Sequence, residues 1–474
     1  MGTVAFFPPE AISPEEIRAL KQVCLVGGYD LTPVPTRSRI DGGKLFLSKD
    51  ANESGYVQMP WPLPGLGAPL STSSTLRERA EPYHLLIELV RGTLNQIRSQ
   101  TAEWQAIGLT LAPADREELR AASASFGREA LDLRSPGQTE RLTELLARTH
   151  RLGDRIARIF ADQLLDTRVR ETGKLSTAFG RRFATLPNDA MRGEIREKFT
   201  AIRLTPEWRT IEPTEAGYNW TRFDELVDWA VGTELAVSIG PIIDLSGDLL
   251  PEWVRQWSGD LPSLTAFFCD FLETVIRRYQ DRVASWQVFH GFNHTDALSL
   301  SEDERLRLAA RLLESARGAA PDGSWTIGIA QPWGDYMIVE EHTYSPLVFT
   351  DTLLRAGFGF ATIELELRPG LGRRDSIPRN SLETFRLLEL FGVLGVPLEV
   401  GIWRPPSGAD LPGSDPDWAV TSFVMAASLP QVKGVYWNNQ YDPTLTPAPG
   451  DTPLFPECAP TPAAIGEIRK LYIV

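Results

Sequence analysis

The chain has 474 residues, of which 42% are hydrophobic and 23% are charged, and its formal net charge is −14. This composition is ordinary for a soluble globular protein, and an acidic chain without a basic stripe argues against a nucleic-acid partner. No run reaches the roughly 18 continuous apolar residues that a membrane-spanning helix needs, so we expect no membrane association.

The first residues read MGTVAFFPPEAISPEEI and contain neither a basic segment nor a long apolar segment. The sequence therefore predicts no secretory signal and a cytoplasmic location. The three cysteines, Cys24, Cys269 and Cys458, lie far apart, which favours neither a disulfide framework nor a metal site. We expect no metal and no other cofactor.

The first 166 residues divide into two parts. Residues 1–75 are rich in proline and glycine and carry short alternating runs such as KLFLSK, which predict a small β-rich domain. Residues 76–166 change to a helical period and contain three amphipathic segments, which predict a helical segment. Neither part has a catalytic signature, although a protein partner could dock on residues 1–166.

From residue 167 to 474, short apolar runs alternate with helical patterns. Eight such runs follow one another: KLSTAFGRRF, FTAIRLTPEW, ELAVSIGPIID, VASWQVFHG, WTIGIAQPW, FGFATIELELR, VPLEVGIW and VKGVYWNN. Eight strand-then-helix units of this size predict an α/β fold, a (β/α)8 barrel. Active sites in this fold lie at the carboxyl ends of the strands, so the last residues of each run are the candidates for function.

Several segments of residues 167–474 carry a family resemblance. They include EPTEAGYNW with DELVDWA, LPEWV, LGVPLEVGIWRPPSG, LPQVKGVYWNN and TPAAIGEIRKLY. In this order they resemble glycoside hydrolase family 10, the retaining endo-β-1,4-xylanases. The resemblance implies a xylanase-like barrel and a saccharide ligand.

The two catalytic glutamates that the resemblance implies are missing from the matching segments. Such enzymes use two carboxyl groups about 5–5.5 Å apart, one as acid/base and one as nucleophile. The fourth run ends in WQVFHG, which puts Gly291 at the acid/base position, and the seventh ends in VGIW, which puts Ile402 at the nucleophile position. A different register would make Glu364 the nucleophile, but its run better resembles the sixth strand.

Other ionisable groups lie near strand ends. The weak catalytic candidates are Glu366, Asp244, Asp335 and His290. Glu366 with Asp244 or Asp335 could form an inverting pair, with carboxyl groups about 6.5–9.5 Å apart. A barrel interior does not hold two bare charges, so Glu364 and Glu366 are expected either to pair with an arginine, such as Arg368 or Arg404, or to lie at the rim.

Aromatic and amide side chains at the strand ends suggest a binding cleft, because the apolar faces of sugars stack on indole rings and thirteen tryptophans is a high count. The candidate ligand-binding residues are Glu207, Trp208, His290, Asn293, Gln331, Trp333, Trp403, Trp437 and Asn439. His290 and His294 are four apart, but a strand end and a glycine rather than a helix hold them, which does not favour a metal site.

Three functions remain open from the sequence. The first is a catalytically degenerate xylanase-like barrel that binds an oligosaccharide, a polysaccharide or a partner in its cleft without retaining hydrolysis. The second is an active glycoside hydrolase with relocated carboxylates. The third is a structural or assembly protein in which residues 1–166 act.

Overall fold

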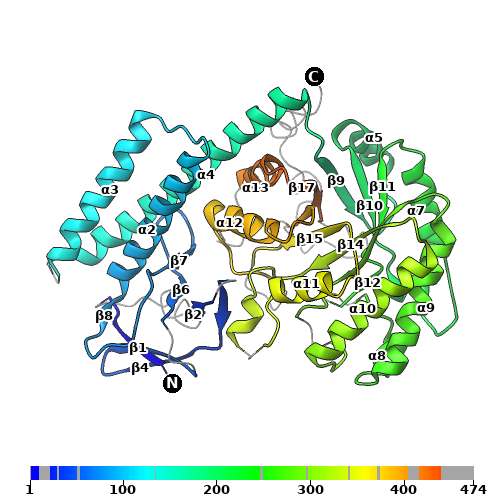
Figure 1. The fold of residues 1–474 in the computed structure, drawn as a ribbon, viewed down its shortest axis with the longest axis horizontal. Coiled ribbons are helices and arrows are strands. Elements are labelled where there is room, and N and C mark those ends of the chain that lie inside the picture. Colours follow the sequence, from blue (N-terminus) through cyan, green and yellow to red (C-terminus); the bar gives the residue numbers. More distant parts are fainter. Residues whose placement is uncertain are drawn as a thin grey trace.

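The computed structural model describes residues 2–9, 22–28, 31–50, 54–133, 135–245, 249–294, 297–339, 342–370, 374–403 and 416–438. Two small sheets and three helices lie beside a barrel of strands and helices (Figure 1). Within these residues, none of the helices combines the length and the apolar character needed to cross a membrane.

The amino-terminal part holds two four-stranded sheets. The first has the order β4 (Arg37–Asp41), β5 (Lys44–Lys49), β1 (Gly2–Phe7) and β8 (Tyr83–His84). The second has the order β3 (Thr32–Val34), β2 (Cys24–Gly27), β6 (Tyr56–Pro60) and β7 (Leu70–Thr72). Residues of β1 and β5 alternate between buried and half-buried, as strands with one covered face do. Strand β8 lies beyond residue 75, so the sheet extends past the boundary expected from composition.

Three helices connect these sheets to the barrel: α2 (Leu85–Ala106), α3 (Pro113–Leu131) and α4 (Gln138–Thr172). One side of α2 and α4 packs on the sheets through residues such as Leu89 and Leu146. Their other end packs on the barrel, where Trp104 stacks on Phe160 at 4.6 Å and meets Phe385 edge-on at 5.0 Å. The helical segment therefore shares a hydrophobic core with the barrel.

Eight parallel strands form the closed barrel, and the third of them consists of two short segments. Its strands, in chain order, are β9 (Ala178–Phe183), β10 (Ala201–Leu204), β11 (Ala236–Ile239) continued by β12 (Ile243–Asp244), β13 (Ser285–His290), β14 (Ser324–Ile329), β15 (Thr362–Leu367), β16 (Leu398–Ile402) and β17 (Val432–Trp437). Strand β17 pairs with β9, and β11 pairs with β13, so the sheet closes on itself. All eight predicted strands are present, and the predicted (β/α)8 barrel is confirmed.

Helices surround the barrel. They are α5 (Asp189–Lys198), α6 (Trp208–Ile211), α7 (Thr221–Val231), α8 (Glu252–Arg255), α9 (Leu261–Tyr279), α10 (Glu302–Ala319), the 3-10 helix η1 (Asp335–Ile338), α11 (Pro346–Arg355), α12 (Ser381–Gly392) and α13 (Pro416–Ser428). Local signals fix several starts, such as the capping box of Ser301 and Glu304 at α10. Apolar faces such as Phe268, Phe271 and Leu272 of α9 pack on the strands.

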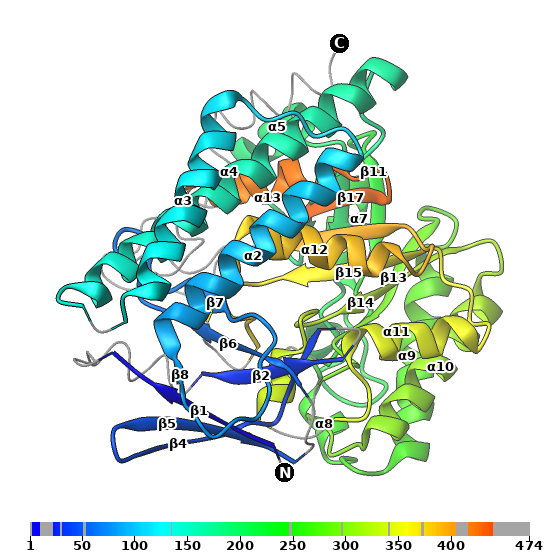
Figure 2. The same cartoon turned by 60° about the vertical axis from the view of Figure 1, so that its left-hand side comes forward.

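Among the described residues, the contacts between the amino-terminal sheets and the barrel include one made by β3 and one made around His150. Strand β3 lies against η1, at the carboxyl end of the fifth barrel strand. Figure 2 shows β2 and β6 below α2 and β7. The second contact, which we call the His150 joint, comprises Ser71 of β7, His150 of α4 and Asn380 at the start of α12. His150 Nε2 lies 2.9 Å from Ser71 Oγ, and His150 Nδ1 lies 3.3 Å from Asn380 Nδ2.

The hydrogen bonds of the His150 joint define the state of its imidazole. Asn380 Oδ1 already accepts a hydrogen bond from the backbone N–H of Glu383 at 2.9 Å, so the amide group of Asn380 turns its N–H donors to His150. His150 Nδ1 therefore accepts, and Nε2 carries the proton that is donated to Ser71. Burial lowers the pKa of His150 to about 4, which keeps the ring neutral.

Candidate functional site

The centre of the barrel contains a network of four charged residues, of which Arg182, Arg203 and Glu364 are buried and Glu399 is partly buried. Arg182 of β9 donates from Nη2 to Glu364 of β15, at 2.7 Å to Oε1 and 3.1 Å to Oε2. Arg203 of β10 donates to the other side of Glu364 and, at 2.6 Å, to Glu399 of β16. The Arg203 guanidinium also lies 4.0 Å from the centre of the Tyr436 ring. The interior of this barrel is therefore ionic, where most barrels of this class have aliphatic side chains.

The two arginines determine the protonation of these acids. Burial of Glu364 opposes its ionisation, but Arg182 and Arg203 outweigh that effect and hold its pKa below the usual range. Burial raises the pKa of Glu399, and the nearby Glu364 adds to this effect, so that Arg203 and Arg182 do not fully offset it. The expected pairing of Glu364 with an arginine is confirmed, and its partners among the described residues are Arg182 and Arg203 instead of Arg368. Arg404, the other expected partner, lies outside the described residues.

A second buried pair lies nearer the strand ends. His290, the last residue of β13, places Nε2 3.4 Å from Glu366 Oε2 on β15, and both side chains are about 5% exposed or less. Burial would lower the pKa of His290, yet the carboxylates of Glu366 and Asp244 outweigh burial and raise it. Burial likewise opposes ionisation of Glu366, and His290 outweighs it and lowers the pKa of Glu366. The two groups therefore form an ion pair.

Glycine on the strand between them makes this pairing possible. In the parallel register, Gly328 of β14 lies beside His290 on one side and Glu364 on the other. A Cβ atom at Gly328 would lie only 2.5 Å from His290 Nδ1 and would also collide with Gln287 Nε2. The missing side chain thus lets His290 and Gln287 reach across the barrel.

Strands four and seven have no carboxylate at Gly291 and Ile402, the two positions that the family resemblance matches to the catalytic glutamates. Gly291 follows β13 with φ of 77°, a left-handed conformation that favours glycine. At the seventh strand a Cβ on Gly401 would lie 3.0 Å from Glu364 Oε1, so Gly401 faces the barrel axis. Because side chains alternate along a strand, Ile402 faces the helices, where it is fully buried. Gly401 rather than Ile402 is therefore the inward residue at this strand end.

Asp335 and Asn293 have structural partners. Asp335, in η1, accepts from Arg379 Nη1 at 2.7 Å and Nη2 at 2.6 Å, and from the backbone N–H of Ile377 at 2.9 Å. Asn293 exchanges hydrogen bonds of 2.8 and 3.1 Å with the backbone of Ala330. Asp335 therefore ties together the loops after strands five and six, and the buried amide of Asn293 ties the loop after strand four to strand five.

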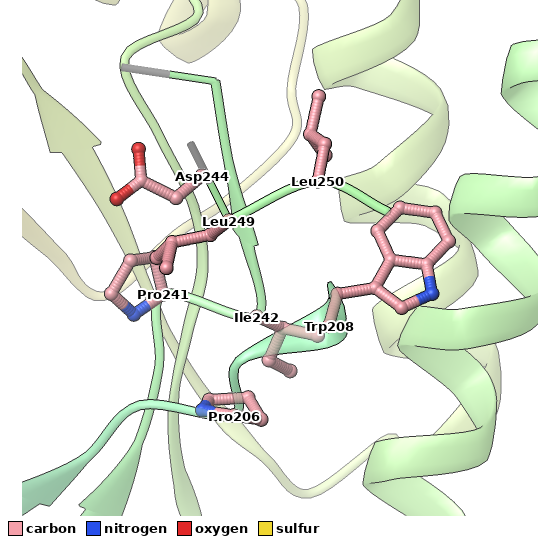
Figure 3. A pocket seen from close by; sticks show the side chains of 7 residues that line it. All are labelled: Pro206, Trp208, Pro241, Ile242, Asp244, Leu249 and Leu250. Atoms are coloured by element: carbon pink, nitrogen blue, oxygen red, sulfur yellow. The ribbon is translucent and has the colours of Figure 1, made fainter. Parts of the chain in front are cut away.

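Asp244 and Trp208 line a hollow at the ends of strands two and three. The hollow has a volume of about 190 Å³, open solvent included, and its other walls are Pro206, Pro241, Ile242, Leu249 and Leu250. Figure 3 shows Asp244 and Trp208 on opposite sides of it. Trp208 is only 1% exposed, stacks on Phe271 at 4.5 Å and donates from Nε1 to Glu212 at 2.7 Å. The indole expected in an open cleft is thus part of the hydrophobic core.

The remaining aromatic candidates differ in exposure. Trp333 and Trp403 are half-buried, and each has an arginine over its ring: Arg379 at 4.7 Å and Arg368 at 4.8 Å. Trp437 is 2% exposed at the end of β17.

The remaining polar candidates are Glu207, Gln331 and Asn439. Glu207 is half-buried just before α6, and Gln331 is buried with φ of 42°. Asn439 lies outside the described residues.

His290, Glu366 and Asp244 thus gather at the strand ends of a (β/α)8 barrel. Over the ranges that the structure describes, no group of three or more His, Cys, Asp or Glu side chains could hold a metal ion. The arginines inside the barrel were missed in the sequence analysis. Their signal was the presence of Arg182 and Arg203 within otherwise apolar strand runs.

Comparison with known proteins places this barrel near one family. A family model described as Glycosyl hydrolase family 10 matches residues 180–304. The endo-β-1,4-xylanase Xyn10C of Cellvibrio japonicus is 24% identical over 123 residues, which are 23% of this chain and 20% of that protein. The match therefore spans about a fifth of the length of this curated relative. The barrel region is xylanase-like in sequence over this stretch.

Solved structures of xylanases also match. Native xylanase 10B from Thermotoga maritima has a TM-score of 0.43 and 20% identity, covering 57% of this chain and 85% of that one. Xylanase 10B from Thermotoga petrophila, solved in complex with xylobiose, has a TM-score of 0.42 and 19% identity, covering 60% and 85%.

Proposed function

We propose that this xylanase-like barrel binds a saccharide at the carboxyl ends of its strands and does not perform retaining glycoside hydrolysis. The observation that carries the proposal is the composition of the two strand ends where a retaining enzyme needs its carboxyl groups. Strand four ends in His290 and a left-handed Gly291, and the inward residues of strand seven near its end are Gly401 and Glu399. Glu399 is bonded to Arg203, so it is not available as a nucleophile.

A saccharide is the ligand class that the surroundings support. The curated relative is named a xylanase, and one of the matching solved xylanases was crystallised with xylobiose. In this chain, Trp333 and Trp403 are half-buried beside strand ends five and seven, where an indole can stack on a sugar. These two residues, with His290 as a hydrogen-bonding group, are our proposed contacts.

One observation favours a second candidate, an active hydrolase with relocated groups. His290 is a buried imidazole whose pKa is raised by Glu366 and Asp244, and such a group can donate a proton near neutral pH. Glu366 and Asp244 would then be the carboxylates of this relocated site.

Calorimetric titration with xylohexaose, followed by chromatography of the solution from the calorimeter, distinguishes the two candidates. Binding with intact sugar supports the proposal. Trp403→Ala is then expected to weaken binding about tenfold, since a stacked ring contributes roughly 1 kcal/mol or more. Trp403→Phe is the matched control, because it keeps a flat apolar ring. Shortened products that disappear in Glu366→Gln would establish the hydrolase instead. If the experiment shows neither binding heat nor cleavage, both candidates are contradicted, and an assembly role of residues 1–166 is favoured.

A further inference from the structure

Arg368 and Trp403 are neighbours at the ends of strands six and seven. The β15–β16 ladder continues past both strands, because the Trp403 N–H donates to the Leu367 carbonyl at 2.9 Å. Arg368 directly follows Leu367, so its side chain emerges beside Trp403, and the guanidinium lies 4.8 Å from the indole centre. The pair therefore lies at the mouth of the barrel, next to the buried His290–Glu366 ion pair.

The guanidinium of Arg368 is held in place on one side and open on the other. Its Nε donates to Asp375 Oδ1 at 2.8 Å, and the Arg368 side chain is 34% exposed. The loop is closed by hydrogen bonds from Gly370 N to Ser376 O at 2.9 Å and from Ser376 N to Arg368 O at 2.7 Å. Within the described residues, neither terminal nitrogen of Arg368 has a hydrogen-bond partner. Asp375 and the indole thus fix the guanidinium, and its two terminal NH2 groups are left without a hydrogen-bond partner among the described residues.

The available groups suit a carboxylate. Two parallel N–H donors of a guanidinium match the two oxygens of a carboxylate, and a charge-assisted pair of this kind is stronger than a neutral hydrogen bond. Because stacking and Asp375 already order the side chain, binding costs less conformational entropy. Glu366 lies beneath and would repel an anion, but His290 compensates its charge at 3.4 Å.

We propose that Arg368 and Trp403 form a subsite for an acidic sugar, in which the guanidinium binds the carboxylate of a uronic acid unit and the indole contacts the apolar side of its ring. This inference rests on the proposed function, since it specifies which saccharide the barrel mouth prefers.

The test compares two ligands of equal length by calorimetry on the full chain: xylohexaose, which is neutral, and the same hexaose carrying one glucuronic acid substituent. The acidic ligand is expected to bind about tenfold more tightly, the effect of one additional hydrogen-bonded ion pair. This preference is expected to weaken as salt is added. Arg368→Gln is expected to abolish the preference while leaving the affinity for xylohexaose within about twofold. Arg368→Lys, which keeps the charge but lacks the fork, is expected to retain only part of it.

Arg120→Gln is the matched control, because Arg120 lies on α3 with 72% of its side chain exposed and loses the same charge. If Arg368 only holds its loop in place, Arg368→Gln is expected to weaken the binding of both ligands equally. That result, or equal affinities in the unsubstituted protein, overturns the inference and leaves the proposed function standing. If neither ligand binds, both fail.

Discussion

Two histidines are buried to the same degree in two regions of this molecule, and their pKa values shift in opposite directions. His150, in the joint between the amino-terminal sheets and the barrel, is 1% exposed, and its pKa falls to about 4. His290, in the barrel mouth, is 2% exposed, and its pKa rises because Glu366 and Asp244 outweigh burial. The neighbouring charges, and not the burial, decide whether each ring carries a proton.

The histidine and the arginines inside the barrel also differ in whether they can lose their charge. His290 can release its proton if its acidic partner is lost, whereas Arg182 and Arg203 remain charged at any relevant pH. Removing an acid from the central network should therefore be far more harmful than removing one from the mouth. The following three experiments use this difference, in order of decreasing effect.

Glu364→Gln is expected to have the largest effect. The change leaves Arg182 and Arg203 buried without their shared counter-charge, and breaking such a pair costs about 3–5 kcal/mol of unfolding free energy. Urea unfolding followed by tryptophan fluorescence measures it. Glu314→Gln, on the exposed surface of α10 beside Arg311, is the control and should change stability little. A loss as small as in this control would contradict an essential ionic core.

The His150 joint should make stability depend on acidity. Since the folded pKa of about 4 lies below the ordinary value of 6.5, the unfolded chain takes up this proton first, and stability is lost as pH falls from 6.5 towards 4. The shift corresponds to at most about 3 kcal/mol. His150→Gln is expected to reduce the slope of unfolding free energy against pH by about one proton in this window. Above pH 7 the slopes of the two proteins should agree. An unchanged slope in acid would show that His150 is not the titrating group.

Glu366→Gln is expected to have the smallest effect, because His290 then loses its proton instead of remaining as an isolated charge. The lowered pKa of Glu366 contributes stability that disappears as pH falls below about 4.5, and the raised pKa of His290 contributes stability that disappears as pH rises past its folded value. The substitution should therefore cost about 1–2 kcal/mol near pH 6 and less near pH 9. A constant cost across this range would mean that the two groups are not an ion pair.

The sequence predicted the architecture more completely than the chemistry. Short apolar runs and intervening helical patterns were sufficient for all eight strands, because apolar runs and helix amphipathicity are local signals. His290 and Glu366 were also identified, since strand ends can be read from the same runs.

The partners of Glu364 could not be predicted, because Arg182 and Arg203 reach it only across a closed barrel whose register is set by tertiary pairing. Trp208 was expected in a cleft for a similar reason: its stacking on Phe271 depends on where α9 packs. The contact of β3 with η1 likewise joins residues about 300 positions apart, beyond any sequence period.

The left-handed backbone at Gly291 limits which residues this strand end can accept. A glutamate introduced there would have to adopt φ of 77°, which costs an L-residue with a long side chain roughly 1–2 kcal/mol. An acid at this strand end would therefore need a second change that gives the loop an ordinary backbone conformation. The single substitution Gly291→Glu is expected to yield a less stable protein.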